Sequence, residues 1–229
     1  MEKPGDARIV ESWAKNSAPW TAAVRGGAID SRVLVTNGAI VDAVRSRSPR
    51  TGIDIGCGEG WLVRALSGID MIGVDVVPGL IDTARQAGGG AGDYRVLSYE
   101  QIAQGEWGEG HPALAADVGV CNFSLIRKES VDAVFGAAPT FLRAGGTLIV
   151  QTLHPLVACG DAPYVDGWRE GSWAGFGDQF TDAPPWYFRT LESWVRLYAS
   201  NGLRLLEMRE PIHPGTGKPA SVILIGELG

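Results

Sequence analysis

A glycine-rich turn from Asp54 to Gly60, followed by an acid at Asp75, is the part of this sequence best suited to chemistry. The run reads Asp-Ile-Gly-Cys-Gly-Glu-Gly and comes directly after a short apolar segment. Glycines at positions 56 and 58 let the backbone turn sharply and approach a ligand that side chains would block. Asp75 ends the next apolar segment, where a carboxylate can accept hydrogen bonds from both hydroxyls of a ribose. The pattern therefore predicts a nucleoside-containing ligand at the ends of two strands.

A sheet is needed to position these residues. Residues 51–56 and 71–75 read as strands, and a helix with Leu62, Val63 and Leu66 on its apolar face lies between them. This is a compact βαβ unit, so the two strands should be parallel with a right-handed crossover.

The same alternation continues along the chain. Further strands are expected at 94–97, 117–121, 146–151, 203–208 and 221–226, with helices at 6–25, 31–47, 80–87, 130–142 and 190–200. Near-continuous apolar strands alternating with helices predict a Rossmann-like, doubly wound α/β fold with a seven-stranded, mostly parallel sheet.

Residues 154–188 break the alternation. They hold eight of the chain's nineteen aromatic residues, together with the acids Asp161, Asp166, Glu170, Asp178 and Asp182. A long irregular segment in a compact domain is usually a functional lid or a disordered linker. Disordered segments are poor in aromatic residues, so we interpret this segment as an aromatic lid.

Composition excludes several classes of protein. The net charge is −6 and no cluster of Lys and Arg is visible, which argues against nucleic acid as a partner. No apolar run approaches the length of a membrane helix, and the N-terminus has no apolar signal region. The few cysteines and histidines lack metal-ligand or disulfide spacing: Cys57, Cys121, Cys159, His111, His154 and His213. We therefore expect a cytoplasmic protein with no metal site.

The glycine spacing also bears on the type of nucleotide. A dinucleotide fingerprint would read G-x-G-x-x-G, but here the glycines fall at 56, 58 and 60, and position 61 is Trp. Glu59 lies where a pyrophosphate would meet the next helix, which is unfavourable for a dianion and acceptable for a cation. A nicotinamide-dependent oxidoreductase is therefore the alternative rather than the main hypothesis.

These residues resemble the class I S-adenosylmethionine (SAM)-dependent methyltransferases, and more closely their small-molecule, type 11-like branch. Asp54 to Gly60 is similar to the first motif of that superfamily, and Asp75 is similar to its second-strand acid. Residues 142–148 resemble its L-x-P-G-G-x-L turn, with Ala144 in place of proline. The resemblance covers roughly residues 6–227. It implies an N-terminal helical cap and an antiparallel C-terminal hairpin.

The resemblance implies SAM as the cofactor and S-adenosylhomocysteine (SAH) as its product. Asp75 should bind the ribose, and Arg32 is a candidate partner for the SAM carboxylate. The full set of implied cofactor residues is Trp20, Arg32, Asp54, Gly56, Cys57, Gly58, Asp75, Val76, Ser98, Tyr99, Asn122 and Phe123. The sequence Asn122-Phe123-Ser124-Leu125 lacks the prolines of enzymes that methylate amino groups of nucleic acids.

The sequence says less about the residues that would contact the methyl acceptor. His154 directly follows the fifth strand and is the candidate general base, although it could instead be a hydrogen-bonded residue that positions the lid. The candidate substrate contacts are the aromatic residues Trp168, Trp173, Phe176, Trp186 and Tyr187, which compete with a reading as core packing. The acids of the lid could favour a cationic acceptor.

We therefore expect one methyltransferase domain over residues 1–229. Its parts would be a helical cap (1–48), a SAM-binding core (50–153), a lid (154–189) and a C-terminal helix with hairpin (190–229). The acceptor would be a small molecule, with no nucleic acid or membrane as partner, and the protein a monomer or homodimer. A non-catalytic SAM-binding protein remains the second alternative, because class I methyl transfer requires no invariant catalytic side chain.

Overall fold

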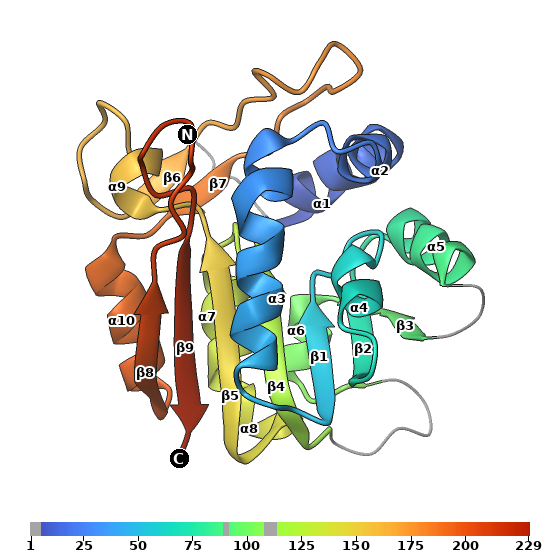
Figure 1. Cartoon of the computed structure of the whole chain (residues 1–229), viewed down its shortest axis with the longest axis vertical. Coiled ribbons are helices and arrows are strands. Elements are labelled where there is room, and N and C mark those ends of the chain that lie inside the picture. Colours follow the sequence, from blue (N-terminus) through green and yellow to red (C-terminus); the bar gives the residue numbers. More distant parts are fainter. Residues whose placement is uncertain (1–5, 89–91, 108–113) are drawn as a thin grey trace.

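Seven strands form the central sheet of the computed structural model, which describes residues 6–88, 92–107 and 114–229 (Figure 1). The strands are β1 (Thr51–Ile55), β2 (Asp70–Asp75), β3 (Asp93–Val96), β4 (Ala116–Asn122), β5 (Leu142–Thr152), β8 (Leu203–Arg209) and β9 (Val222–Leu228). Their order across the sheet is β3-β2-β1-β4-β5-β9-β8. All pairs from β3 to β5 are parallel, whereas β9 is antiparallel to both of its neighbours. The structure confirms the predicted fold and its C-terminal hairpin.

The strand order places the ligand-binding edge. The chain runs outward from β1 to β2 and β3 on one side, and to β4 and β5 on the other. A crevice therefore opens where the carboxyl ends of β1 and β4 meet, which is the usual ligand position in such sheets. The glycine turn leaves β1 at this point.

Helices cover both faces of the sheet (Figure 1). They are α1 (Asp6–Lys15), α2 (Ser17–Arg25), a π-helical turn η1 (Arg32–Thr36), α3 (Asn37–Arg45), α4 (Trp61–Ala65), α5 (Pro78–Ala87), α6 (Tyr99–Ala103), α7 (Glu129–Gly136), α8 (Ala138–Phe141), α9 (Pro155–Ala158) and α10 (Leu191–Ser200). Apolar side chains of α3, α4 and α5 pack on one face. Those of α6, α7, α8 and α10 pack on the other, so the core has two layers separated by the sheet.

Two expected helices are each divided in the structure. Residues 6–25 form α1 and α2, because Pro19 has no N–H to bond the carbonyl four residues earlier and fits only near the start of a new helix. The helix expected at 130–142 is divided into α7 and α8 for the same reason at Pro139, and Leu142 already begins β5. The 154–189 segment also carries more regular structure than expected. It contains a two-stranded antiparallel sheet of β6 (Gly167–Arg169) and β7 (Trp186–Phe188).

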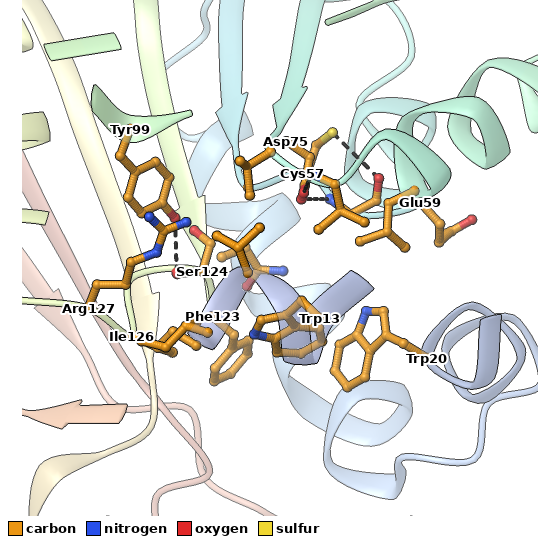
Figure 2. A pocket seen from close by; sticks show the side chains of 18 of the residues that line it. Trp13, Trp20, Cys57, Glu59, Asp75, Tyr99, Phe123, Ser124, Ile126 and Arg127 are labelled. Atoms are coloured by element: carbon orange, nitrogen blue, oxygen red, sulfur yellow. Dashed lines mark hydrogen bonds between the residues drawn. The ribbon is translucent and has the colours of Figure 1, made fainter. Parts of the chain in front are cut away.

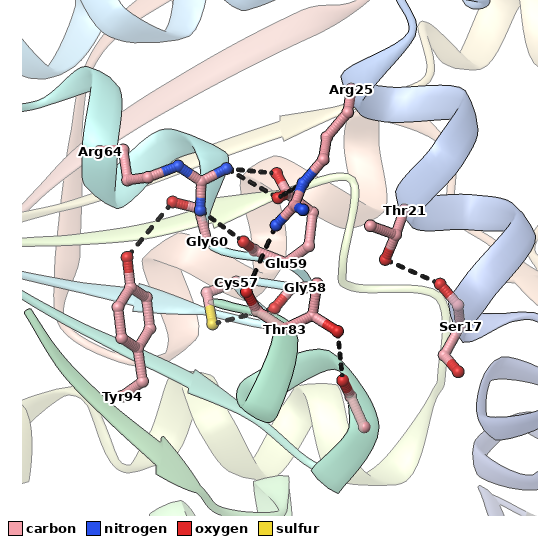
Figure 3. Close-up of polar contacts among 11 residues, drawn as sticks. Ser17, Thr21, Arg25, Cys57, Gly58, Glu59, Gly60, Arg64, Thr83 and Tyr94 are labelled. Carbon is pink, nitrogen blue, oxygen red and sulfur yellow. Dashed lines mark hydrogen bonds and ion pairs between the residues drawn. The ribbon is translucent and has the colours of Figure 1, made fainter. Parts of the chain in front are cut away.

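A buried acid joins α2 to the glycine turn (Figure 3). The Glu59 side chain is 1% exposed and accepts hydrogen bonds from two arginines. Arg64 on α4 donates from Nη2 at 2.7 and 2.8 Å, and Arg25 at the end of α2 donates from Nε at 2.8 Å. The negative charge of Glu59 is therefore neutralised by the protein, and the pairing holds α2 against the sheet.

Replacing Glu59 should test this connection. We expect Glu59→Ala to lower the free energy of unfolding by about 2–3 kcal/mol, because it removes three charge-assisted hydrogen bonds and leaves two arginines without their acceptor. The matched control is Glu192→Ala, which breaks an exposed pair with Arg196 on α10 and should cost less than about 0.5 kcal/mol. Equal losses in urea denaturation would contradict a structural role for Glu59.

Candidate functional site

The glycine turn after β1 is shaped for close approach by a ligand. Gly56, Gly58 and Gly60 have φ angles of 78°, 56° and 79°, which lie in the left-handed region that favours glycine. A Cβ on Gly56 would overlap Ser124, so a larger residue cannot be accommodated there. At Gly58 the nearest atom to such a Cβ is Nε1 of Trp20, 3.9 Å away. Open space therefore lies beside the Gly58 backbone.

Asp75 binds the turn to the end of β2. Its Oδ2 accepts a hydrogen bond from the Gly58 N–H at 2.9 Å, and its Oδ1 accepts one from the Val77 N–H at the same distance. Burial raises the pKa of this carboxyl, and the two backbone hydrogen bonds oppose that rise. Each carboxylate oxygen can accept a further hydrogen bond. The group can therefore receive two neighbouring hydroxyls while it still holds the turn.

Arg32 is a buried cation with an unused donor. Its guanidinium carbon lies 5.6 Å from the ring centre of Trp20 and 5.1 Å from that of Trp61. The residue is 8% exposed, and its Nη2 has no hydrogen-bond partner. Burial lowers its pKa to about 10, so the side chain stays charged at neutral pH. An unpaired buried charge is costly, which makes this position suited to an anionic ligand group.

These residues surround a cavity of about 100 Å³ at the carboxyl ends of β1, β2 and β4 (Figure 2). Ten of the twelve residues predicted to bind the cofactor line it: Trp20, Arg32, Gly56, Cys57, Gly58, Asp75, Val76, Tyr99, Asn122 and Phe123. Ile9, Val10 and Trp13 of α1 also line the cavity. We refer to it as the first cavity.

Asp54 and Ser98 are the two predicted cofactor residues that do not line the first cavity. Asp54 is 1% exposed at the end of β1, and its Oδ1 has no hydrogen-bond partner. Burial, reinforced by the nearby Asp75 charge and opposed by Arg32, raises its pKa to about 7. Ser98 caps α6, accepting a hydrogen bond from the Gln101 N–H.

A second cavity of about 300 Å³ adjoins the first. Trp13, Trp20, Arg32, Phe123 and Ile126 line both cavities, so the two meet at these side chains. Four of the five predicted substrate contacts line the second cavity: Trp173, Phe176, Trp186 and Tyr187. The fifth, Trp168, packs edge-on against the Tyr187 ring, with ring centres 5.6 Å apart, and does not line it.

Phe123 stands at the junction in a strained conformation. Its φ of 55° is uncommon for a bulky residue, and such strain concentrates at functional sites. The preceding residue, Asn122, has its amide oxygen bonded to Nε2 of buried Gln151 at 2.7 Å. Gln151 is itself held by the Thr36 carbonyl and the Ser221 hydroxyl. This network leaves the Asn122 amide N–H groups for the first cavity.

His154, the predicted general base, lines neither cavity. It is 2% exposed, and its Nε2 lies 2.7 Å from Glu210 Oε1. Its chain neighbours Leu153 and Pro155 do line the second cavity. The structure thus places the imidazole in an ion-pair position beside the site, and no contact with the cavities supports a role as base.

Several lining residues were not among the predicted site residues. Trp13 lines both cavities, and its seven-residue spacing from Trp20 was the available signal. Arg127 lines the first cavity with its guanidinium carbon 4.7 Å from the Tyr99 ring centre. Arg189, in the second cavity, had no such signal, because its neighbours are distant in sequence.

Metal and membrane features can be assessed for the described residues only. Within them no group of three His, Cys, Asp or Glu side chains could hold a metal ion. Among the same residues, every helix is too short or too polar to span a bilayer. His111 lies outside the described part of the chain.

Comparison with known proteins agrees with this geometry. A family described as "Methyltransferase domain" matches residues 36–208. The chain belongs to this family, and with it to the class I SAM-dependent methyltransferases. A ubiquinone biosynthesis O-methyltransferase from Methylococcus capsulatus is 31% identical over 119 residues, which is 50% of this chain and 48% of that protein. The chain thus spans about half the length of this curated relative.

Solved structures share the fold. A 1,6-didemethyltoxoflavin-N1-methyltransferase from Burkholderia thailandensis, with bound 1,6-didemethyltoxoflavin and SAH, is similar with a TM-score of 0.64 and 14% identity over 100% of this chain and 93% of that chain. A SAM-dependent methyltransferase from Mesorhizobium loti has a TM-score of 0.60 and 19% identity over 82% of this chain and 97% of that chain.

The raised pKa of Asp54 predicts a pH-dependent stability. Between its ordinary value of 3.8 and about 7, the native state holds a proton that the unfolded chain releases, so this carboxyl destabilises the fold as pH rises. Asn carries no such cost. The free energy of unfolding of Asp54→Asn, taken relative to that of wild type, should therefore be roughly 2 kcal/mol higher at pH 8 than at pH 5.

The measurement is urea denaturation of both proteins at the two pH values. Asp178→Asn changes an exposed carboxyl and serves as the control, for which the difference from wild type should stay constant. A constant difference for Asp54→Asn as well would show that Asp54 is ionised in the native state at both pH values.

Proposed function

We propose that this protein transfers the methyl group of SAM to a small molecule that occupies the second cavity. One observation carries the proposal: a cavity with an acid for a ribose and an arginine with a free donor for a carboxylate shares five lining side chains with a larger aromatic cavity. The family assignment supports the cofactor, and the size and apolar lining of the second cavity support a small acceptor over a macromolecule. The ubiquinone-pathway relative and the toxoflavin methyltransferase act on small molecules by their names.

The residues of the first cavity fit the parts of SAM. Asp75 would accept both ribose hydroxyls while the Gly58 backbone lies against the ligand. Arg32 would bind the methionine carboxylate with its free Nη2 and so remove the cost of its buried charge. Tyr99, at the start of α6, would lie along the adenine, and the Asn122 amide would face the sulfonium end.

SAM, when bound, supplies an activated methyl group on a positively charged sulfur. The chain needs only to align the acceptor with that methyl and to exclude water. Phe123 and Ile126, at the junction of the cavities, are placed to fix the approach of the acceptor. A protein that binds SAM without transferring its methyl would not need a second cavity at this position, which disfavours the non-catalytic alternative.

We also propose that segment 154–189 acts as a lid together with α1 and α2. Asn16 exchanges two hydrogen bonds with the Thr181 backbone, and Lys15 pairs with Asp182 at 2.6 Å. Trp13 contacts the Trp173 ring edge-on at 5.6 Å. These contacts join α1 and the start of α2 to segment 154–189 beside both cavities, and we propose that SAM enters when these contacts open.

The nicotinamide alternative is weaker for a second reason. The chain matches a methyltransferase domain over residues 36–208. We also expect a cytoplasmic protein that acts as a monomer or homodimer and binds neither nucleic acid nor membrane.

Loss of the Asp75 carboxylate should weaken SAM binding. We expect Asp75→Ala to raise the dissociation constant for SAM and for SAH at least about tenfold, or about 1.4 kcal/mol, because the ribose loses its acceptors. Isothermal titration calorimetry provides the measurement. Asp82→Ala removes an exposed carboxylate of the neighbouring α5 and should leave both constants unchanged.

Asp75 also holds the turn, so folding needs its own control. Asp75→Asn keeps the side-chain volume and one acceptor, and its melting curve reports whether the turn survives. A folded Asp75→Asn protein that binds SAM as tightly as wild type would contradict the assignment of the ribose to this residue.

A further inference from the structure

We propose that the methyl acceptor is an apolar ring compound whose nucleophile is an acidic ring hydroxyl, and that this hydroxyl is already ionised when it reaches the methyl group. The proposal rests on the proposed function, because it names the acceptor class of the same site. It follows from the shape, the charge and the proton-accepting groups of the second cavity.

The shape favours a flat apolar molecule. Trp13, Trp20 and Phe123 line the second cavity where it meets the first, and Trp186 and Tyr187 of β7 line it from segment 154–189. Aromatic side chains make favourable stacked or edge-on contacts with flat rings. A cavity of about 300 Å³ with this lining suits a molecule of one or two rings.

The described lining of the second cavity offers no acidic side chain that could pair with a cationic acceptor. Among the described residues around this cavity, the ionic side chains are Arg32 and Arg189, and none is Asp or Glu. The acids of segment 154–189 do not line the cavity. Asp166 accepts from the Thr190 N–H at 2.8 Å, and Asp182 pairs with Lys15. These contacts give no support to the expectation that those acids favour a cationic acceptor.

The positive charge that an acceptor in the second cavity would meet lies at one end of that cavity. Arg189 is already used, because its guanidinium donates to the Arg127 and Lys128 carbonyls and to Asp132. Arg32 lines the junction with the first cavity and is assigned to the SAM carboxylate, so the sulfonium of bound SAM would supply the remaining positive charge at that end. An oxygen anion entering an apolar cavity loses its hydration, and opposite charges in a medium of low polarity repay that cost.

The acids that line the first cavity, Glu59 and Asp75, already accept hydrogen bonds from the protein, and the second cavity has no acid in its described lining. Its described residues include no His, Lys or Cys, and His154 lies outside it with Nε2 on Glu210. A ring hydroxyl must therefore lose its proton to water before it binds. Its oxygen then forms a bond to the methyl carbon as the carbon–sulfur bond breaks and leaves the electron pair on sulfur. The oxygen anion and the sulfonium lose their charges together, giving a neutral methyl ether and a thioether.

The test uses three phenols of graded acidity as probes: para-nitrophenol, para-cyanophenol and para-cresol. SAH formation by the full-length protein gives kcat/KM for each probe across pH. We expect the rising part of each profile to have its midpoint at the pKa of the probe itself, so that the midpoint moves across the series. His154→Gln should leave those midpoints in place. Tyramine resembles para-cresol with an added ammonium group. Its kcat/KM should be at least roughly tenfold lower than that of para-cresol.

Three results would overturn the proposal. One is a single midpoint for all phenols, because a protein group would then take the proton. Another is a preference for tyramine over para-cresol. The third is the absence of both turnover and tryptophan quenching with every phenol. Calorimetry with SAM alone separates the hypotheses: a protein that binds SAM but rejects phenols loses only this acceptor class, whereas one that does not bind SAM loses the proposed function.

Discussion

The Asp75 carboxylate is the group on which the geometry of the site depends, because it holds the glycine turn after β1 and the start of α5 at the end of β2. Its two oxygens accept the backbone N–H groups of Gly58 and Val77, one from the turn after β1 and one from the start of α5. Those bonds fix the backbone of the turn relative to the carboxylate. The same carboxylate is thus both a structural acceptor and the proposed ligand contact, and burial makes its charge expensive unless both sets of hydrogen bonds are made.

The buried charged residues near Asp75 differ in whether the protein itself supplies their partners. Glu59 is fully neutralised by Arg25 and Arg64, so it holds α2 in place and adds no free charge to the first cavity. Arg32 and Asp54 are left with unpartnered polar atoms in the same region. A ligand with a carboxylate and two positive centres, as SAM has, would supply counter-charges that the protein itself withholds. Stability is given up here for binding, which is expected at functional sites.

Much of the fold was predictable because it depends on local patterns. Apolar strands that end in glycine or acid defined the parallel sheet, and the turn from Asp54 to Gly60 marked its ligand edge. The helix breaks at Pro19 and Pro139 could also have been read from the sequence, since proline lacks the required N–H. The small β6–β7 sheet could not, because it depends on contacts between two short segments within an irregular stretch.

The residues of the site also divide into those placed by local sequence and those placed by contacts between distant segments. Residues within the first motif lie together because a tight turn fixes them locally, and most of the predicted cofactor residues line one cavity. His154 lies against Glu210 and Trp168 against Tyr187, so neither side chain lines the cavity for which it was predicted. No local sequence pattern reveals these partners. Arg189 reaches the second cavity through hydrogen bonds to residues about sixty positions earlier. Long-range pairing of this kind defines the acceptor cavity.

The most direct test of the central claim is thermal melting of the protein with SAM, SAH and NAD in parallel, each in large excess. A ligand at about 100 times its dissociation constant stabilises the native state by roughly 2.7 kcal/mol. For a chain of this size that corresponds to a rise in Tm of about 5–10 °C. The account predicts such a rise with SAM and SAH and none with NAD. A rise with NAD alone would contradict the assignment of the glycine turn, the Asp75 carboxylate and Arg32 to a SAM site.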